Sequence, residues 1–372
     1  MVNEKRVVDE FIQLVQVDSE ARHEREIADI LLQKLNDLGI EAFEDDTAKI
    51  TGHSAGNIIA SMKGNLKGAD PIYFTCHMDT VTPGKGVKPS IVDGKVITDG
   101  TTILGADDKA GIAAFLEAAR VIKEQSVPHG DVQFIITVGE EVGLVGSSAL
   151  DPSHLKANYG FALDSSGEVG EIVVAAPSQA KIHAKIYGKT AHAGVAPEKG
   201  ISAITIAAHG ISNMELGRLD EETTANIGTI NGGTATNIVC DYVEVIGETR
   251  SLVTEKMEKQ AGSMKAAFTA AAEKFGGKAE VEVNFSYSGY KLGDGDEVVE
   301  VAKKAISDIG LTPRLTQSGG GSDANVFSGH GIPTVNLAVG YEEIHTTHEK
   351  MPIANLVKLT EVVVAVIKAA NR

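Results

Sequence analysis

The stretch IYFTCHMDTV, residues 72–81, joins an apolar strand to two side chains of the kind that bind metals or move protons. Its first three residues are large and apolar, as expected of a strand that is covered on both faces. His77 and Asp79 follow with one residue between them, so in an extended chain their side chains point to the same side. The stretch therefore predicts a buried strand with a polar site at its carboxyl end.

The composition indicates a globular protein with a strong negative charge. Of the 372 residues, 42% are hydrophobic and 23% are charged, and the formal net charge is −17. Nucleic acids and anionic membranes require a basic face, so neither is expected as a partner. The two cysteines are too few for a disulfide framework or a cysteine-based zinc site. The N-terminus lacks the apolar core of a signal peptide and no apolar run approaches about 18 residues, so we expect a cytoplasmic protein without a membrane span.

Helical and strand-like patterns alternate over the first part of the chain. The expected helices are residues 4–16, 24–38 and 109–123, and the expected strands are residues 57–62, 72–76, 132–138 and 159–163. The strands are short, apolar and bounded by turn residues, as buried strands are. This alternation predicts a largely parallel sheet that is covered by helices on both faces.

The middle of the chain follows a different pattern. Residues 179–187 alternate polar and apolar side chains, which indicates a sheet with one face in water. The elements that follow are a helix at 201–214, strands at 226–230 and 238–249, a helix at 255–275 and a strand at 280–287. This β-α-β-β-α-β order is that of a split, ferredoxin-like fold. The first pattern returns with a helix at 297–309, a strand at 333–339 and a helix at 356–370. We therefore predict one domain formed by residues 1–177 and 290–372, with a smaller domain inserted at residues 178–289.

Several strand ends carry side chains that commonly bind metals. These are His77 and Asp79, Asp107 and Asp108 in GADDKAG, Glu140 and Glu141 in ITVGEEVG, Asp164 in FALDSSG, and His345 and His348 in EEIHTTHEK. Ligands of an open α/β sheet bind at the carboxyl ends of its strands, so we expect these side chains to converge. Histidine with carboxylates suits zinc, manganese or cobalt. About five ligands are more than one catalytic zinc uses, so the set predicts two metals that share a bridging carboxylate.

In this order, the His-x-Asp pair and GADDKAG, GEEVG, ALD and IHTTHE resemble the motifs of the M20 family of co-catalytic metallopeptidases. DGTTILGADDKAG most resembles the peptidase T branch, the tripeptide aminopeptidases. The resemblance covers essentially the whole chain. It implies a zinc-peptidase-like mixed sheet flanked by helices, with an inserted ferredoxin-like α+β lid domain that forms homodimers in some members.

The resemblance also implies a set of metal ligands. They are His77, Asp107, Glu141, Asp164 and His345. Asp107 would bridge, sharing one metal with His77 and Asp164 and the other with Glu141 and His345. The two ions would be zinc, with manganese or cobalt as alternatives. His348 competes with His345, because residues three apart share a helical face.

Roles beyond metal binding follow from the same resemblance. Glu140 would be the general base, Asp79 would orient the ring of His77, and a cis peptide bond would join Asp107 to Asp108. Taken alone, Asp108 reads as a charge at a helix N-terminus. The lid motif GKTAHAGVAPEKGISAI would place His192 over the metals to polarise the scissile carbonyl, from the neighbouring subunit in dimeric members. The residues expected to contact substrate are Asn237, Arg250, Gly319 and Gly320. Arg250 could instead be a solvated charge, and the glycines only a turn.

The function implied is removal of the N-terminal residue from short peptides, tripeptides above all, by a metal-bridging hydroxide with Glu140 as base. Asp164 favours this reading, because aminopeptidases and dipeptidases of the family carry aspartate there while many deacylases and carboxypeptidases carry glutamate. Two alternatives remain. One is an M20 deacylase or carboxypeptidase that acts on N-acyl amino acids or dipeptides. The other is an inactive peptide-binding module, which would be marked by the loss of Glu140 or a ligand, and none is lost.

Overall fold

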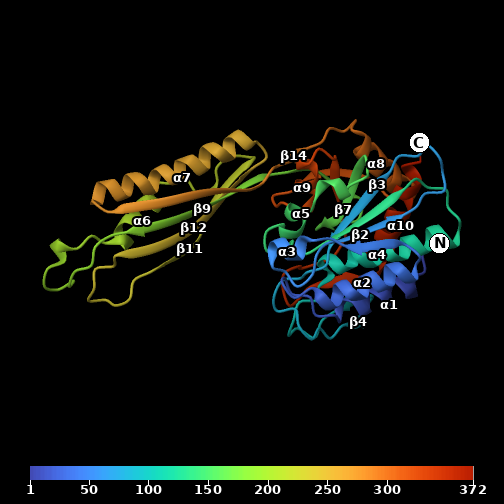
Figure 1. Ribbon diagram of the computed structural model, residues 1–372, viewed down its shortest axis with the longest axis horizontal. Coiled ribbons are helices and arrows are strands. Elements are labelled where there is room, and N and C mark those ends of the chain that lie inside the picture. Colours follow the sequence, from blue (N-terminus) through green and yellow to red (C-terminus); the bar gives the residue numbers. More distant parts are fainter. Residues whose placement is uncertain (372) are drawn as a thin grey trace. The chain divides into compact units, whose positions relative to one another are not determined.

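The protein, described by a computed structural model over residues 1–371, consists of two compact units (Figure 1). The larger unit contains Met1–Ala175, Leu292–Gln317 and Ser322–Arg372, and the smaller contains Ala176–Lys291 and Ser318–Gly321. All of the predicted metal ligands lie in the larger unit. The predicted lid and substrate residues, from His192 to Gly320, lie in the smaller one.

The larger unit is built on a mixed sheet with the strand order β1-β2-β6-β3-β7-β16-β8, and β15 lies beside β8. These strands are β1 (Glu41–Glu44), β2 (Ile58–Met62), β3 (Ile72–His77), β6 (Val132–Thr137), β7 (Tyr159–Ser165), β8 (Glu171–Ala176), β15 (Arg314–Gln317) and β16 (Thr334–Ala338). The central strands β6, β3, β7 and β16 are parallel, whereas β1–β2, β2–β6 and β8–β16 are antiparallel pairs. The sheet is therefore mixed, as the family resemblance implies, with parallel pairing at its centre and between β8 and β15.

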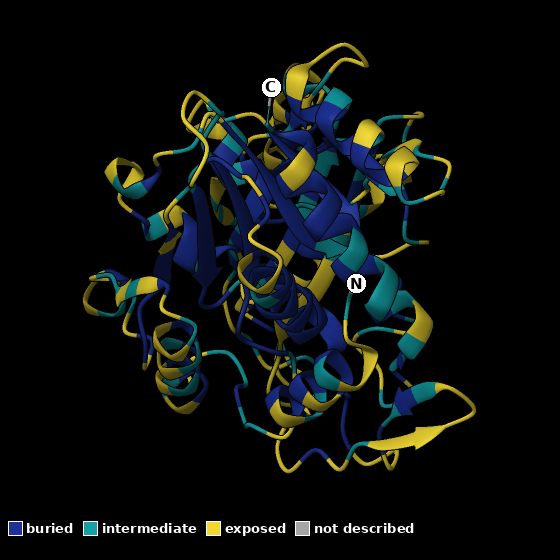
Figure 2. Cartoon of the chain, turned by 90° about the vertical axis from the view of Figure 1, so that its right-hand side faces the viewer, coloured by how far each residue is buried: buried dark blue, intermediate teal, exposed yellow. Residues whose placement is uncertain are grey.

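Helices bury this sheet. They are α1 (Glu4–Val15), α2 (Arg25–Asp37), α3 (Thr47–Thr51), α4 (Ala106–Glu124), α5 (Val145–Ala149), α8 (Glu297–Asp308), α9 (Asp323–Gly329) and α10 (Ile353–Ala369), with a 3₁₀ turn at Pro152–His154. Helix α4 packs on β3 and β7 and is covered by α1 and α10. The rings of Phe115 on α4 and Phe134 on β6 stack with centroids 3.8 Å apart, and Phe74 of β3 packs against Phe115. Burying each such ring contributes about 1.5–3 kcal/mol to the stability of the fold. The packed rings hold the strands in place and so determine where their ends lie. Figure 2 shows the inner strands in the dark blue of buried residues.

A small antiparallel sheet completes the larger unit. It consists of β4 (Ser90–Val92), β5 (Lys95–Ile97) and β17 (Lys350–Pro352), in the order β17-β5-β4. Because β17 lies close to the C-terminal histidine motif, this sheet helps to anchor that motif. Within residues 1–371, every helix is too short or too polar to cross a bilayer.

The smaller unit is an antiparallel sheet with two helices packed on one face. Its elements are β9 (Ser178–Tyr187), a 3₁₀ turn at Pro197–Lys199, α6 (Ala203–Ser212), β10 (Gly217–Arg218), β11 (Thr223–Gly232), β12 (Tyr242–Ser251), α7 (Thr254–Phe275), β13 (Lys278–Tyr287) and β14 (Tyr290–Lys291). The strand order is β10-β11-β12-β9-β13. Ile186, Val243 and Phe268 are buried between sheet and helices, while His183 and Glu244 pair on strands β9 and β12. Apart from the two-residue strand β10, this order is consistent with the predicted β-α-β-β-α-β pattern.

Candidate metal centre

The centre of the sheet brings the ligand-type side chains to one edge. His77 is the last residue of β3, Asp164 lies near the end of β7, and Glu140 and Glu141 follow β6. Because β6, β3 and β7 are adjacent and parallel, their carboxyl ends meet at the same edge. Asp107 reaches this edge from the first turn of α4.

Asp107 lies between two imidazole rings. Its Oδ1 is 3.1 Å from Nε2 of His77, and its Oδ2 is 3.2 Å from Nε2 of His345. Nε2 of His77 is also 3.8 Å from Oδ1 of Asp164, and Nε2 of His345 is 2.9 Å from Oε1 of Glu141. The structure thus brings together all five residues that were predicted as ligands. The two oxygens of one carboxylate face different histidines.

The choice between the two histidines of the C-terminal motif is resolved by their contacts. His345 has a positive φ of 61° and aims its ring at the carboxylates of Asp107 and Glu141. His348 is exposed, and its main-chain N–H donates to Oγ1 of Thr346 at 3.1 Å. His345 is therefore the histidine that faces the cluster.

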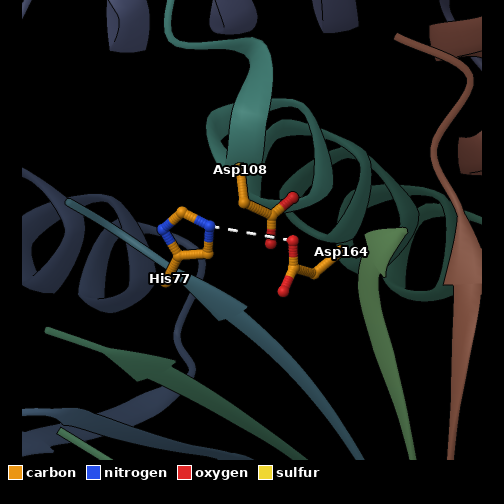
Figure 3. Close-up of side chains that lie close together, drawn as sticks. All are labelled: His77, Asp108 and Asp164. Atoms are coloured by element: carbon orange, nitrogen blue, oxygen red, sulfur yellow. Dashed lines mark ion pairs between the residues drawn. The ribbon is translucent and has the colours of Figure 1, made fainter. Parts of the chain in front are cut away.

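Asp108 lies deeper in the site than its sequence position indicates. It is in the first turn of α4, joined to Asp107 by the predicted cis peptide bond, but it is fully buried. Both of its carboxylate oxygens lack a hydrogen-bond partner among the described residues. One of these oxygens lies within 4.8 Å of a ring nitrogen of His77 and of a carboxylate oxygen of Asp164, and Figure 3 shows the three side chains facing one another. Burial and the charges of Asp164 and Asp107 raise the pKa of Asp108 well above its usual value. The reading of Asp108 as only a helix-end charge is therefore incomplete.

Asp79 contacts the ring of His77 most closely through its main chain. Nδ1 of His77 is 2.9 Å from the carbonyl oxygen of Asp79 and 3.6 Å from its Oδ1. The carboxylate instead accepts the main-chain N–H groups of Glu140, at 3.0 Å, and Glu141, at 3.2 Å. Asp79 thus links the end of β3 to the turn that carries Glu140 and Glu141.

The pKa values show how strongly the cluster's charges interact. Burial lowers the pKa of His77, but hydrogen bonds to Asp107 and Asp164 outweigh burial and raise that pKa well above its usual value. Burial alone would raise the pKa of Asp107, yet hydrogen bonds from His345 and His77 hold it far below its usual value. Burial, with the charge of Asp107, raises the pKa of Asp164 to about 7.

The residues present fit divalent metal ions. Carboxylates buried at this density are costly unless cations compensate them. The donor atoms are imidazole nitrogens and carboxylate oxygens, the set preferred by zinc and also accepted by manganese and cobalt. The site therefore has the charge and the donor chemistry of a metal centre.

The turn that carries Glu140 is held by packing as well as by Asp79. Gly139 has a φ of +60°, and a Cβ there would lie 2.3 Å from the ring of His53. Nδ1 of His53 is 2.7 Å from Oε1 of the buried Glu24. His53 had no predicted role, because nothing in its local sequence shows that its ring packs on residue 139.

Burial and the charges of Asp164, Asp323 and Glu141 raise the pKa of Glu140 well above its usual value.

The smaller unit gathers the other predicted residues in two places. The segments of His192 and Asn237 are paired, since the N–H of Ala193 donates to the carbonyl of Asn237 at 2.9 Å. Arg250 forms an ion pair with Glu248, in which Nε of the arginine lies 2.9 Å from Oε1 of the glutamate. A Cβ on Gly320 would lie 3.7 Å from Nη1 of Arg250, and one on Gly319 would meet no atom within 4 Å.

The third glycine of that run has a packing role. A Cβ on Gly321 would lie 2.3 Å from the ring of Tyr287, so no larger residue fits there without a shift. The glycine run is therefore required in part by packing, while Gly319 and Gly320 leave their main chain open to approach.

Comparison with known proteins agrees with this arrangement. Residues 73–369 match the peptidase family M20/M25/M40. The chain is 64% identical to the protein YqjE of Bacillus subtilis (strain 168) over the full length of both. It is 63% identical, with a TM-score of 0.93 and full coverage of both chains, to the crystal structure of aminopeptidase PepT from Bacillus cereus ATCC 10987. A tripeptidase from Staphylococcus aureus subsp. aureus Mu50 is 49% identical with a TM-score of 0.96, again over both full chains. The resemblance to peptidase T-like proteins is thereby confirmed, and the chain belongs to the peptidase family M20/M25/M40.

Proposed function

We propose that this protein is a di-metal aminopeptidase that removes the N-terminal residue from short peptides, with tripeptides as its main substrates. The observation that carries the proposal is the position of Asp107, whose two oxygens lie 3.1 and 3.2 Å from the imidazoles of His77 and His345. A carboxylate placed in this way suits a bridging ligand between two ions. Similarity to an aminopeptidase and a tripeptidase supports the substrate class.

We assign the ligands as the family resemblance implies. His77, Asp107 and Asp164 would hold one ion, and Asp107, Glu141 and His345 would hold the other. Zinc is the proposed metal, with manganese and cobalt as alternatives. Bound there, divalent ions lower the pKa of a water molecule towards neutrality and polarise the scissile carbonyl.

The chain's own residues supply the proton transfers and the alignment. Glu140 takes a proton from the attacking water and delivers it to the leaving amine. The carboxylate of Asp79 holds the turn that carries the base Glu140 and the proposed ligand Glu141, because it accepts the main-chain N–H groups of both residues. His192 polarises the carbonyl, and Arg250 binds a peptide carboxylate through paired hydrogen bonds. Asn237, Gly319 and Gly320 contact the substrate main chain.

The proposed organisation extends to the whole protein. Residues 1–177 and 290–372 form the catalytic domain, and residues 178–289 form a lid through which a homodimer assembles in the cytoplasm. In that case His192 would act in its own subunit or across the dimer. Sedimentation of the full chain at micromolar concentrations would measure the association. The same measurement on a variant altered at the edge strand β13 would provide the comparison.

A substrate panel tests the proposed reaction. The metal-reconstituted protein should release free alanine from Ala-Ala-Ala and should leave N-acetyl-Ala intact, with Ala-Ala-amide reporting how far a free C-terminus is needed. Chromatography of the products gives the answer for zinc, manganese and cobalt in turn. Cleavage of N-acetyl-Ala without cleavage of the tripeptide would favour the deacylase reading. No turnover with any metal would favour an inactive binding module.

His192→Ala should lower turnover of Ala-Ala-Ala by about 10²–10³-fold, the usual cost of losing a group that stabilises a developing oxyanion. Metal content should stay unchanged, because His192 is not among the proposed ligands. Kinetics and elemental analysis of the same sample measure both quantities. His209→Ala is the matched control and should behave as wild type, because His209 is a half-buried histidine on α6 of the same unit with no proposed role. Normal activity of the His192 variant would remove this residue from the mechanism.

A further inference from the structure

Glu349 is a buried carboxylate that joins two loops carrying proposed metal ligands. It is 1% exposed and lies four positions after His345, immediately before β17. Its Oε2 accepts the main-chain N–H groups of Leu104 and Gly105, each at 2.8 Å. Its Oε1 accepts the N–H of Asp107 at 3.1 Å. One side chain from the C-terminal motif thus binds three N–H groups at the start of the GADDKAG segment.

Glu349 supplies part of a cap that α4 cannot make for itself, because Asp107 is the second residue of the helix, while Leu104 and Gly105 immediately precede it. The first N–H groups of a helix have no acceptor within the helix and are usually bound by an N-cap side chain. The N-cap position of α4 is Gly105, which has no side chain and has a φ of 77°. Asp107 and Asp108 also depart from helical φ and ψ. The main chain around Asp107 is therefore fixed by Glu349, 242 residues away in the sequence.

The same residue anchors the loop of His345. His345 has a φ of 61°, a conformation that a residue with a side chain rarely adopts without support. Glu349 ends this loop, and its own N–H donates to the carbonyl of Thr346 at 3.2 Å. A shift of Glu349 would therefore move the ring of His345 and the main chain of Asp107 relative to each other.

We propose that Glu349 is a positioning residue that sets the spacing between Asp107 and His345, and so the affinity of the metal site formed by Asp107, Glu141 and His345. The proposal rests on the ligand roles given under the proposed function. Glutamine at position 349 would keep one carbonyl oxygen but would turn an NH₂ group towards at least one N–H donor. Some carboxylates accept hydrogen bonds from metal-ligating residues without binding the metal themselves. Mutating such a carboxylate commonly lowers metal affinity or activity by about 10–100-fold.

The test is a metal titration of metal-free Glu349→Gln. We expect one of two ions to bind about 10–100-fold more weakly than in wild type, with two ions still bound at saturation. Cobalt absorption spectra, and zinc competition against a coloured chelator, measure the affinity and the ligand geometry. Hydrogen exchange at the amides of residues 104, 105 and 107 should be faster in the metal-free variant. Glu343→Gln is the matched control, because Glu343 is an exposed carboxylate of the same loop that pairs with Lys350 at 2.6 Å.

The outcomes separate this inference from the proposed function. Wild-type affinity for both ions in folded Glu349→Gln would overturn the positioning role of Glu349. Should that variant fail to fold, Glu349→Asp keeps the charge and shortens the reach by one methylene. It should show the same weakening, and wild-type affinity there would overturn the inference equally. Wild-type protein that binds no divalent ion would instead overturn the proposed function.

Discussion

Replacing Glu140 with alanine should leave two divalent ions bound and lower kcat for Ala-Ala-Ala by about 10²–10⁴-fold, the range expected for a general base. The side chain removed is the proposed proton carrier and not a proposed ligand, so the loss should fall on the chemical step. The turn should keep its place, because its main-chain N–H groups remain bound to Asp79. Elemental analysis and steady-state kinetics of the same preparation measure both parts of the prediction.

The neighbouring glutamate is the natural control. Oε1 of Glu141 lies 2.9 Å from Nε2 of His345, so Glu141→Ala should lose metal as well as activity. The two variants remove the same number of atoms from adjacent positions of one turn. If Glu140→Ala loses an ion and Glu141→Ala keeps both, the two roles must be exchanged.

The sequence was sufficient to predict that several side chains of metal-ligand type converge, because the ends of the strands that carry them follow from local rules. Short apolar runs predict buried strands, and the ends of parallel neighbours must meet, so His77, Asp164 and Glu141 could be expected at one edge. The order of elements in the smaller unit was equally accessible, since alternation and helical periodicity are local properties. The mixed character of the large sheet was implied by the family resemblance and not by local patterns, because the antiparallel edge strand EAFE at β1 is only four residues long.

The sequence was insufficient where the decisive contact is distant or involves main-chain atoms. The carboxylate of Asp79 lies 3.6 Å from Nδ1 of His77, but its closest partners could not be predicted from that spacing. The partners of its carboxylate are main-chain N–H groups some sixty residues later. The contacts of Glu349 are also to main-chain N–H groups, which leave no signature in residue type. The residue pattern gave no such signal for Asp108, because α4 carries charged side chains along its length and is nevertheless almost wholly buried.

Asp107→Ala should abolish tight binding of both ions, whereas Asp164→Ala should weaken only one. Alanine at 107 removes Oδ1 from the neighbourhood of His77 and Oδ2 from that of His345, so each proposed site loses one of its ligands. Alanine at 164 removes an oxygen that lies 3.8 Å from Nε2 of His77, in one proposed site only. The two variants therefore distinguish a bridging carboxylate from a ligand of a single ion.

The measurement combines stoichiometry with stability. After dialysis against limiting zinc, we expect two ions in wild type, one in Asp164→Ala and none in Asp107→Ala. A ligand that binds only the folded state stabilises it by about 2.7 kcal/mol when present at 100 times its Kd. Added zinc should therefore raise the Tm of wild type, raise that of Asp164→Ala less, and leave that of Asp107→Ala nearly unchanged. Retention of one tightly bound ion by Asp107→Ala would mean that Asp107 serves a single site, because a shared ligand cannot be removed without loss at both.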